Sequence, residues 1–376
     1  MPAAHKVPCV IRPRRTIMVF QGGGALGAYQ AGVFEALSQT EHAPNWVVGT
    51  SIGAINAALI AGNPPERRLQ SLRAFWGHIS QNAAAAQLPI SADQDAATVN
   101  FLRNFYTLSF GLKGFFQPRP FSPFPLNMVT TACEASFYDV SQLRASLERF
   151  VDFDYLATSP VRLSVGAVDI ESAKIVYFDS HHTRIRPEHI LASGALPPAF
   201  PAVEINGRYY WDGGIYSNTP LEWILHEPRD HSLCIFATLW QQEDGPPQCL
   251  QDVLRRTKEI QFASRAETLL ELERETHRLR HSVNLLTREL AQLDPGNPLV
   301  NLGEWGCGSV FHLIHLQVPR LLGEDHTKDI EFEPQRVAQR WAAGFADLQR
   351  ALDAKPWNAV VNPTEGIVVH DFATVP

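Results

Sequence analysis

Short apolar runs alternate with amphipathic stretches at the beginning of the chain. The run Ile17–Phe20 predicts a buried strand, and after the glycine-rich segment Gly22–Gly27 apolar positions recur at helical spacing through Leu37. A second apolar run, Trp46–Val48, is followed directly by a helical pattern over Ile52–Ile60. Strands that alternate with helices in this way predict a parallel sheet with helices packed on its faces.

The same kinds of pattern continue along the rest of the chain. Strands are predicted over residues 161–170, 174–179, 232–239 and 310–318, a hairpin turn at Asn206-Gly207, and helices over residues 67–79, 141–150, 250–290 and 335–352. The polar, Gly- and Pro-rich segment 241–247 predicts a boundary. We therefore expect a tail over residues 1–14, a main domain over 15–240 and an α-rich extension over 241–376.

The composition is that of a globular protein without a nucleic-acid partner. Of 376 residues, 45% are hydrophobic and 19% are charged, and the formal net charge of −7 gives no basic surface for phosphates. Five cysteines, never spaced as Cys-x-x-Cys, predict neither a disulfide framework nor a structural zinc site. The apolar run after Arg15 is too short for a signal peptide or a membrane span. We therefore expect a cytoplasmic protein that contacts membranes only peripherally.

Gly49-Thr50-Ser51-Ile52-Gly53 has the pattern Gly-x-Ser-x-Gly between a predicted strand and a predicted helix. In that context the pattern is typical of a nucleophile elbow, a tight turn that projects the serine hydroxyl from the end of a sheet. The N-terminus of the following helix favours negative charge at the same place. The alternative interpretation is an ordinary turn made of small residues.

The glycine-rich segment Gly22–Gly27 has two functional interpretations. As Gly-x-Gly-x-x-Gly after a strand, it matches a dinucleotide-binding fingerprint. That fingerprint needs an acidic residue at the end of the second strand, and the nearest one, Glu41, precedes the strand. As an oxyanion hole, consecutive glycines let backbone N–H groups approach a developing alkoxide. We favour the oxyanion hole, which would lie beside Ser51 because both segments follow successive parallel strands.

Asp212-Gly213-Gly214 offers the base that a serine nucleophile needs. None of the 14 histidines lies in a recognisable catalytic or metal-binding motif. A carboxylate is a weak base at its ordinary pKa of about 3.9. Burial beside Trp211 would raise that pKa and make the aspartate a better proton acceptor. A surface turn is the alternative interpretation of this segment.

These three motifs, in this order along the chain, resemble the patatin-like phospholipase family. The resemblance extends through residues 27–33, 49–57 and 192–201 and covers roughly residues 15–220. It implies an α/β fold with three αβα layers and a mainly parallel sheet. It also implies hydrolysis of fatty-acyl esters of lipids and phospholipids, without a metal or other cofactor.

The resemblance implies roles for single residues. Ser51 would be the nucleophile and Asp212 its base, in a Ser–Asp dyad without histidine. Many members of the family carry Arg or Lys at the position of Leu26, so this chain lacks a positive charge there, and slower turnover or less anionic substrates would follow. The oxyanion hole would consist of Gly22, Gly23 and Gly24, and the other motif glycines are Gly27, Gly49, Gly53, Gly213 and Gly214.

Two further segments suggest contacts with other molecules. Residues 101–124, in an expected cap over 81–125, contain seven phenylalanines, three basic residues and no acidic residue. This composition suits docking on an anionic lipid surface, although core packing under a lid is the favoured interpretation. The helical tract after residue 250 would pack on the main domain or form a homo-oligomer.

Three alternatives to a lipid hydrolase stay open at the level of the sequence. A transacylase would pass the acyl group from Ser51 to an alcohol. A nucleotide-binding regulator would use Gly22–Gly27 and would not need Ser51. A non-catalytic lipid-binding protein would bind vesicles without forming an acyl-enzyme.

Overall fold

The central sheet is formed by segments from both the main domain and the C-terminal extension. The computed structural model describes residues 13–81, 96–120, 127, 129–225, 231–263 and 266–372. The strands of the large sheet are β1 (Arg15–Phe20), β2 (Trp46–Gly49), β5 (Arg162–Asp169), β6 (Lys174–Asp179), β7 (Val203–Ile205), β8 (Arg208–Asp212), β9 (Ser232–Thr238), β10 (Phe311–Gln317) and β11 (Ile367–Asp371). Two short strands, β3 (Gln117–Pro118) and β4 (Tyr138–Asp139), pair separately.

The sheet is mainly parallel, as predicted. Its strand order is β11-β10-β9-β1-β2-β5-β8-β7, and β6 also pairs with β5. Neighbours from β11 through β5 run parallel, whereas β6 and β8 run antiparallel to β5. The extension predicted after residue 240 therefore contributes β10 and β11 to the same sheet as the main domain.

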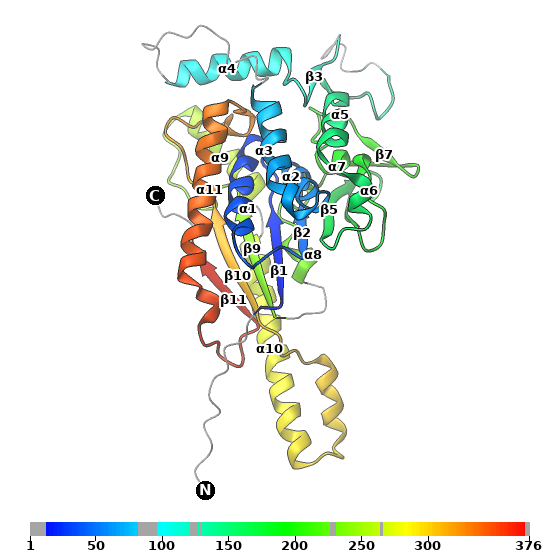
Figure 1. Ribbon diagram of the computed structural model, residues 1–376, viewed down its shortest axis with the longest axis vertical. Coiled ribbons are helices and arrows are strands. Elements are labelled where there is room, and N and C mark those ends of the chain that lie inside the picture. Colours follow the sequence, from blue (N-terminus) through cyan, green and yellow to red (C-terminus); the bar gives the residue numbers. More distant parts are fainter. Residues whose placement is uncertain are drawn as a thin grey trace.

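Helices cover both faces of this sheet (Figure 1). The α-helices are α1 (Ala28–Ser38), α2 (Ile52–Ala61), α3 (Pro65–Gln81), α4 (Ala96–Phe110), α5 (Ser141–Phe150), α6 (Phe153–Leu156), α7 (Pro187–Ser193), α8 (Leu221–Leu225), α9 (Leu250–Ala263), α10 (Ala266–Leu293) and α11 (Pro334–Ala354). The 3-10 helices within the described residues are η1 (Gly24–Gly27), η3 (Gly213–Ile215), η4 (Pro298–Trp305), η5 (Lys328–Ile330) and η6 (Pro356–Asn358).

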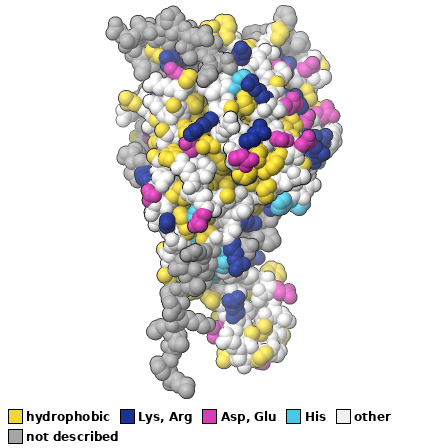
Figure 2. All heavy atoms as spheres, viewed as in Figure 1, with side chains coloured by type: hydrophobic (Ala, Val, Ile, Leu, Met, Phe, Trp, Pro, Cys, Tyr) yellow, Lys and Arg dark blue, Asp and Glu magenta, His cyan; other side chains and the backbone are white. Residues whose placement is uncertain are grey.

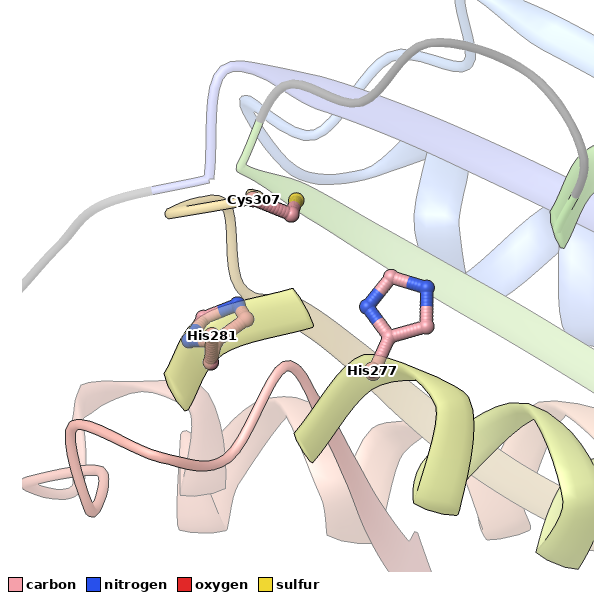
Figure 3. Close-up of side chains that lie close together, drawn as sticks. All are labelled: His277, His281 and Cys307. Atoms are coloured by element: carbon pink, nitrogen blue, oxygen red, sulfur yellow. The ribbon is translucent and has the colours of Figure 1, made fainter. Parts of the chain in front are cut away.

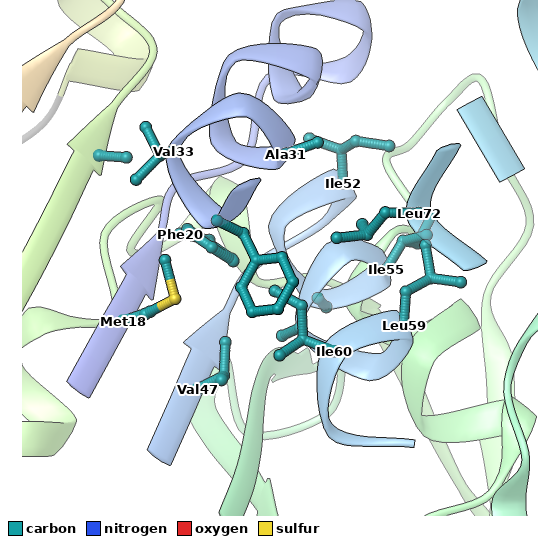
Figure 4. Packing of buried hydrophobic residues seen from close by; sticks show 14 of the residues in the cluster. Met18, Phe20, Ala31, Val33, Val47, Ile52, Ile55, Leu59, Ile60 and Leu72 are labelled. Carbon is teal, nitrogen blue, oxygen red and sulfur yellow. The ribbon is translucent and has the colours of Figure 1, made fainter. Parts of the chain in front are cut away.

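Alternate residues of the central strands point into two separate cores. Met18 and Phe20 of β1 face the helices α1 and α2, where they pack with Val47, Ile55 and Ile60 (Figure 4). The residues between them, such as Val19, face the opposite side and pack against α8 and the beginning of α10. This alternation follows from the two-residue period of a strand. Together the two cores confirm the predicted three αβα layers.

The predicted elements are found in the structure, which also contains elements that were not predicted. Every strand and helix predicted above is present, and the tract 250–290 is divided into α9 and α10. The short elements β3, β4, α6 and β11 and the helices α4, α7 and α8 were not predicted. The tail over residues 1–12 and parts of the expected cap, residues 82–95 and 121–126, lie outside the described residues.

Two glycines let α1 and α11 cross in direct backbone contact. A Cβ atom on Gly32 would overlap the carbonyl oxygen of Trp341. One on Gly344 would overlap the carbonyl oxygen of Tyr29. The buried Tyr29 hydroxyl also donates a 2.8 Å hydrogen bond to Asp347 Oδ2. The extension helix α11 is therefore part of the layer that covers the sheet.

Gly344→Ala should lower the free energy of unfolding by about 2–3 kcal/mol, because the added methyl group forces α1 and α11 apart. Gly77→Ala in α3 is the matched control, since no atom lies within 4 Å of the Cβ it adds. That control should raise stability by about 0.5–1 kcal/mol, as alanine suits a helix better than glycine does. Urea unfolding measures both, and similar effects of the two substitutions would contradict the direct backbone contact.

Candidate active site

The structure brings the predicted nucleophile and the predicted base together across β5. Gly49, the last residue of β2, pairs with Val165 of β5. Asp212, the last residue of β8, pairs with Ala167 of the same strand. Because Ser51 comes two residues after Gly49, its turn reaches the level of Asp212.

Ser51 lies in a strained turn between β2 and α2. Its φ of 57° and ψ of −124° are rarely adopted by residues other than glycine and cost about 1–3 kcal/mol. The flanking glycines make room for this turn: a Cβ on Gly49 would overlap the backbone of Gly53, and a Cβ on Gly53 would overlap the carbonyl oxygen of Phe20. This is the strained strand-to-helix geometry predicted for a nucleophile elbow.

A buried serine of α7 fixes the elbow from the side. The Ser51 backbone N–H lies 3.1 Å from both the carbonyl oxygen and the hydroxyl oxygen of Ser193. The Ser193 hydroxyl donates in turn to the carbonyl oxygen of Gly166 at 2.6 Å. The strained conformation of Ser51 is therefore held by a chain of hydrogen bonds that ends on β5.

Asp212 is buried, with 2% of its surface exposed, and the Ser51 hydroxyl donates a hydrogen bond to its carboxylate. The Gly214 N–H donates a second hydrogen bond, 2.7 Å long, to Oδ1. Burial raises the pKa of Asp212 to about 7, although both hydrogen bonds act against this rise. Among the described residues, no histidine is a hydrogen-bond partner of Asp212. A carboxylate with a pKa near neutrality is suited to accept and return a proton.

The glycine-rich loop after β1 lies against the elbow, as the order of the strands predicted. A Cβ on Gly22 would lie 2.9 Å from Ser51 Cβ. The Gly22 N–H donates to Asn218 Oδ1 at 3.1 Å, and the Asn218 side-chain amide donates to the Gly22 carbonyl oxygen at 2.9 Å. For the N–H groups of Gly23 and Gly24, the described part of the chain supplies no acceptor.

The other predicted motif glycines pack at close range around the same turns. A Cβ on Gly27 would lie 2.6 Å from Ile52 Cγ1, and one on Gly213 would lie 2.6 Å from the Gly166 carbonyl oxygen. Gly214 contributes its N–H to Asp212. The structure thus brings all three sequence motifs into one site.

The profile of the family described as patatin-like phospholipase matches residues 18–223, more than half of the chain. The chain belongs to the patatin-like phospholipase family. A second profile, described as patatin phospholipase, matches residues 260–364 of this patatin-like protein. The family resemblance inferred from the three motifs is confirmed.

The solved structures that match this patatin-like protein are distant from it. VipD from Legionella pneumophila has 12% identity and a TM-score of 0.42, with 92% of this chain and 67% of VipD covered. A chain of the ExoU-SpcU complex from the type III secretion system of Pseudomonas aeruginosa has 15% identity and a TM-score of 0.36, with 92% and 52% covered. This chain thus spans about two thirds of the first and about half of the second. No curated protein sequence matches.

Asn218 and Ser193 are site residues that the sequence analysis of this patatin-like protein missed. Each acts through backbone groups far away in the sequence, Asn218 on Gly22 and Ser193 on Ser51, with separations of 196 and 142 residues. Asn218 does have a local signal, because it follows the Asp-Gly-Gly motif in a polar turn that ends in Pro220. Ser193 lies within the segment 192–201 that carried part of the resemblance.

Leu26, where many patatin-like proteins carry a basic residue, is fully buried in the core. A positive charge nevertheless lies close to the glycine loop. The buried Lys328 ammonium is 5.5 Å from the centre of the Trp240 ring, and the Trp240 indole N–H donates to the Gly22 carbonyl oxygen at 2.7 Å. Glu259, also buried, accepts a 2.8 Å hydrogen bond from Lys328 and balances this charge.

The phenylalanine-rich segment of the patatin-like protein divides into a buried and an exposed part. Phe115 and Phe116 are 8% and 4% exposed and belong to the main core, as the favoured interpretation predicted. Phe105 and Phe110 of α4 are 59% and 64% exposed. Among the described phenylalanine side chains of this segment, Phe105 and Phe110 are therefore the ones that can meet a lipid surface. Within the described ranges, no helix has the length and apolar character needed to cross a membrane.

One face of the patatin-like protein carries side chains of mixed character. On the face shown in Figure 2, basic, acidic and apolar groups are interspersed. The arm formed by α10 and η4 projects from the body (Figure 1) and exposes Leu279, Leu286 and Leu293. Pairing of two subunits through these helices stays a prediction.

Proposed function

We propose that this protein hydrolyses fatty-acyl esters of lipids by means of the Ser51–Asp212 dyad. The observation that carries the proposal is the hydrogen bond from the Ser51 hydroxyl, on a strained elbow, to a buried aspartate whose pKa is raised to about 7. A serine hydroxyl becomes an effective nucleophile only when a neighbouring group accepts its proton. Membership of the patatin-like phospholipase family supports a lipid ester as the substrate.

In the acylation step, Ser51 Oγ attacks the ester carbonyl carbon while Asp212 takes the hydroxyl proton. The resulting tetrahedral intermediate loses the alcohol part of the lipid, which receives the proton from Asp212. The fatty acyl group then remains on Ser51 as an ester. Asp212 must be deprotonated at the start of this step.

The oxyanion of the intermediate would be stabilised by the Gly22–Gly24 loop. Gly22 contacts Ser51 directly, and its own N–H is bound by Asn218. Gly23 and Gly24 are the donors that we assign to the oxyanion, with Asn218 as a positioning residue that fixes the loop. Preorganised N–H groups of this kind contribute roughly 3–4 kcal/mol each to transition-state stabilisation.

In the deacylation step, Asp212 accepts a proton from water, and the hydroxide formed attacks the acyl-enzyme. The fatty acid leaves, and Ser51 regains its proton from Asp212. An alcohol in place of water would give acyl transfer instead. Both reactions use the same dyad, so the choice depends on what reaches the acyl-enzyme.

Product analysis tests this function on the full chain. Phosphatidylcholine vesicles, lysophosphatidylcholine micelles and diacylglycerol emulsions should be incubated separately with the protein, with and without added glycerol. We expect free fatty acid from at least one of these ester classes, and mainly free acid when glycerol is present. If most of the acyl group were found on glycerol, the proposed function would be transacylation instead of hydrolysis. A folded protein that releases no acyl group from any of them would contradict the proposal.

The exposed face of α4 is the surface that we assign to peripheral membrane contact. Replacing Phe105 and Phe110 with Ser should weaken binding to vesicles of phosphatidylcholine and phosphatidylglycerol by about tenfold or more, because two exposed aromatic side chains are lost from the interface. Hydrolysis of a soluble short-chain ester should be unchanged. Vesicle cosedimentation measures the binding.

The matched control replaces Leu286 and Leu293 with Ser, since these exposed side chains lie on the arm rather than on α4. The control should bind vesicles as the wild type does. Equal weakening in both variants, or weakening in the control alone, would show that α4 is not the membrane-contacting surface.

A further inference from the structure

Three side chains that commonly bind transition metals converge at the base of the α10 arm (Figure 3). His277 and His281 are one turn apart on α10, and both are buried. Cys307 lies in the segment between η4 and β10 and is partly buried. One ligand atom from each of the three lies within 4.8 Å of the other two.

We propose that His277, His281 and Cys307 bind a zinc ion. Two imidazole nitrogens and a thiolate sulfur are a donor set that zinc prefers. Bond lengths of about 2.0–2.1 Å to nitrogen and 2.3 Å to sulfur place neighbouring ligands of a tetrahedral site about 3.3–3.6 Å apart. Small side-chain rotations are enough to reach that spacing from the present one, and the fourth position is left for water.

The surroundings of His281 fit a metal ligand. Its Nδ1 lies 3.1 Å from the Pro363 carbonyl oxygen, and its Nε2 lies 2.9 Å from the Ser309 carbonyl oxygen. Without a metal, the ring satisfies both oxygens only as a doubly protonated cation. A zinc ion on one nitrogen replaces one of these protons, and the other nitrogen keeps its hydrogen bond to a carbonyl, as metal-bound histidines usually do.

Cys307 has a polar neighbour beside its sulfur. The Cys307 sulfur lies 3.0 Å from the Ser309 hydroxyl oxygen. Thiolate is the form that coordinates zinc, so zinc binding at this site releases the thiol proton.

Gly366 leaves room for an ion between the two rings. A Cβ at this position would lie 2.6 Å from His277 Nδ1 and 2.8 Å from His281 Nε2. Any larger residue would fill the space that these two nitrogens share. The loop before β11 therefore forms the third wall of the cluster, beside α10 and the segment before β10.

The cluster is remote from the dyad, because it lies at the opposite edge of the sheet. Cys307 precedes β10 and Gly366 precedes β11, so the cluster is at the edge where the parallel strands begin. Ser51 follows β2, at the edge where these strands end. A zinc ion here would join the base of the arm to the sheet without taking part in hydrolysis. The sequence predicted no metal site, because His277, His281 and Cys307 belong to none of the common local metal-binding motifs.

Metal content and cobalt spectroscopy test the site on the full chain after removal of any purification tag. Stripped protein incubated with zinc and then dialysed should retain about one ion per chain by mass spectrometry. Cobalt(II) in place of zinc should give the visible bands of a tetrahedral ion and a thiolate-to-cobalt band in the near ultraviolet. Cys307→Ser should lose that band, and Cys307→Ser, His277→Gln and His281→Gln should each lower metal affinity by about 100-fold or more.

Cys249→Ser and His182→Gln are matched controls, because both residues are exposed and lie outside the cluster. They should bind metal as the wild type does. A wild-type protein that shows no thiolate-to-cobalt band and retains no zinc would overturn the proposal, and so would undiminished binding in Cys307→Ser. Since the wild-type spectrum is decisive by itself, a variant that fails to fold does not affect the test. Hydrolysis by the stripped protein should be unchanged, because the cluster lies away from the dyad. This readout separates a failure of the zinc proposal from a failure of the proposed function.

Discussion

Replacing Ser51 with alanine should lower the kcat/KM for ester hydrolysis by about 10⁴-fold or more, because the acyl group then has no hydroxyl to which it can be transferred. The substitution removes one oxygen atom and leaves the hydrogen bonds of the Ser51 backbone N–H to Ser193 intact. The fold should therefore be kept. Hydrolysis of a soluble p-nitrophenyl ester gives the rate, and intact-mass measurement after treatment with a fluorophosphonate gives the labelling of the nucleophile.

The wild-type chain should gain a single fluorophosphonate adduct, and the Ser51→Ala chain should gain none. Ser282→Ala is the control, since this serine lies on α10, away from the dyad, and its loss should leave labelling unchanged. An adduct of equal extent on Ser51→Ala would place the nucleophile at another residue. Both readouts are independent of the natural lipid substrate.

Asp212→Asn should lower kcat/KM by roughly 10³-fold or more, since the amide cannot accept the Ser51 proton. In the wild-type protein, kcat/KM should rise with pH and level off above the pKa of Asp212, which burial raises to about 7. The variant should lose this dependence, because it has no carboxylate that titrates in this range. A wild-type profile that is flat between pH 5 and 9 would contradict the role of Asp212 as the base.

The same substitution should make the protein more stable at alkaline pH. The pKa of Asp212 is raised on folding, so the folded chain binds this proton more tightly than the unfolded chain does. The resulting stabilisation is complete below about pH 4, the ordinary pKa, and is lost as the pH rises through about 7. Asparagine does not ionise, so the stability of Asp212→Asn relative to wild type should grow by about 2–3 kcal/mol between pH 5 and 8.5. Thermal unfolding of both proteins at the two pH values measures this difference.

Asp169→Asn is the control, and its expected effect on stability at pH 8.5 is opposite to that of Asp212→Asn. A backbone hydrogen bond from Ser172 holds the pKa of Asp169 below its ordinary value, and Arg208 lies 2.9 Å away. Its carboxylate therefore stabilises the fold at pH 8.5, and this contribution is lost only in acid. Asp169→Asn should be less stable than wild type at pH 8.5. An Asp212→Asn protein that gains no relative stability between pH 5 and 8.5 would show that the buried carboxylate is not the destabilising group.

The central elements could be predicted from the sequence because their signals are local. The apolar strands and the helical periodicity that follow one another from Ile17 to Ile60 fix the parallel core, and Gly-x-Ser-x-Gly has meaning only between such a strand and such a helix. Once the strands are parallel, their ends meet at one edge of the sheet. The proximity of Ser51 to the glycine loop followed from this rule rather than from any contact visible in the sequence.

Long-range contacts could not be predicted in this way. Asn218 fixes Gly22 across 196 residues, and the sequence around Asn218 indicates only a polar turn. Among the described phenylalanine side chains of the segment 101–124, Phe115 and Phe116 are buried in the core, whereas Phe105 and Phe110 are exposed, and the sequence does not distinguish them. Which aromatic side chains are exposed depends on what packs over them, and single-sequence periodicity carries no information about that.

The crossing of α1 and α11 has a consequence for the synthesis of the protein on the ribosome. Asp347, which accepts the hydrogen bond from the Tyr29 hydroxyl, is translated 318 residues after Tyr29. Until α11 is translated, the side of α1 that α11 covers in the folded protein is exposed on the nascent chain. Such exposed apolar surface is what chaperones bind. The helical layer that shares its core with α2, the helix after the Ser51 turn, is therefore completed only after α11 has been translated.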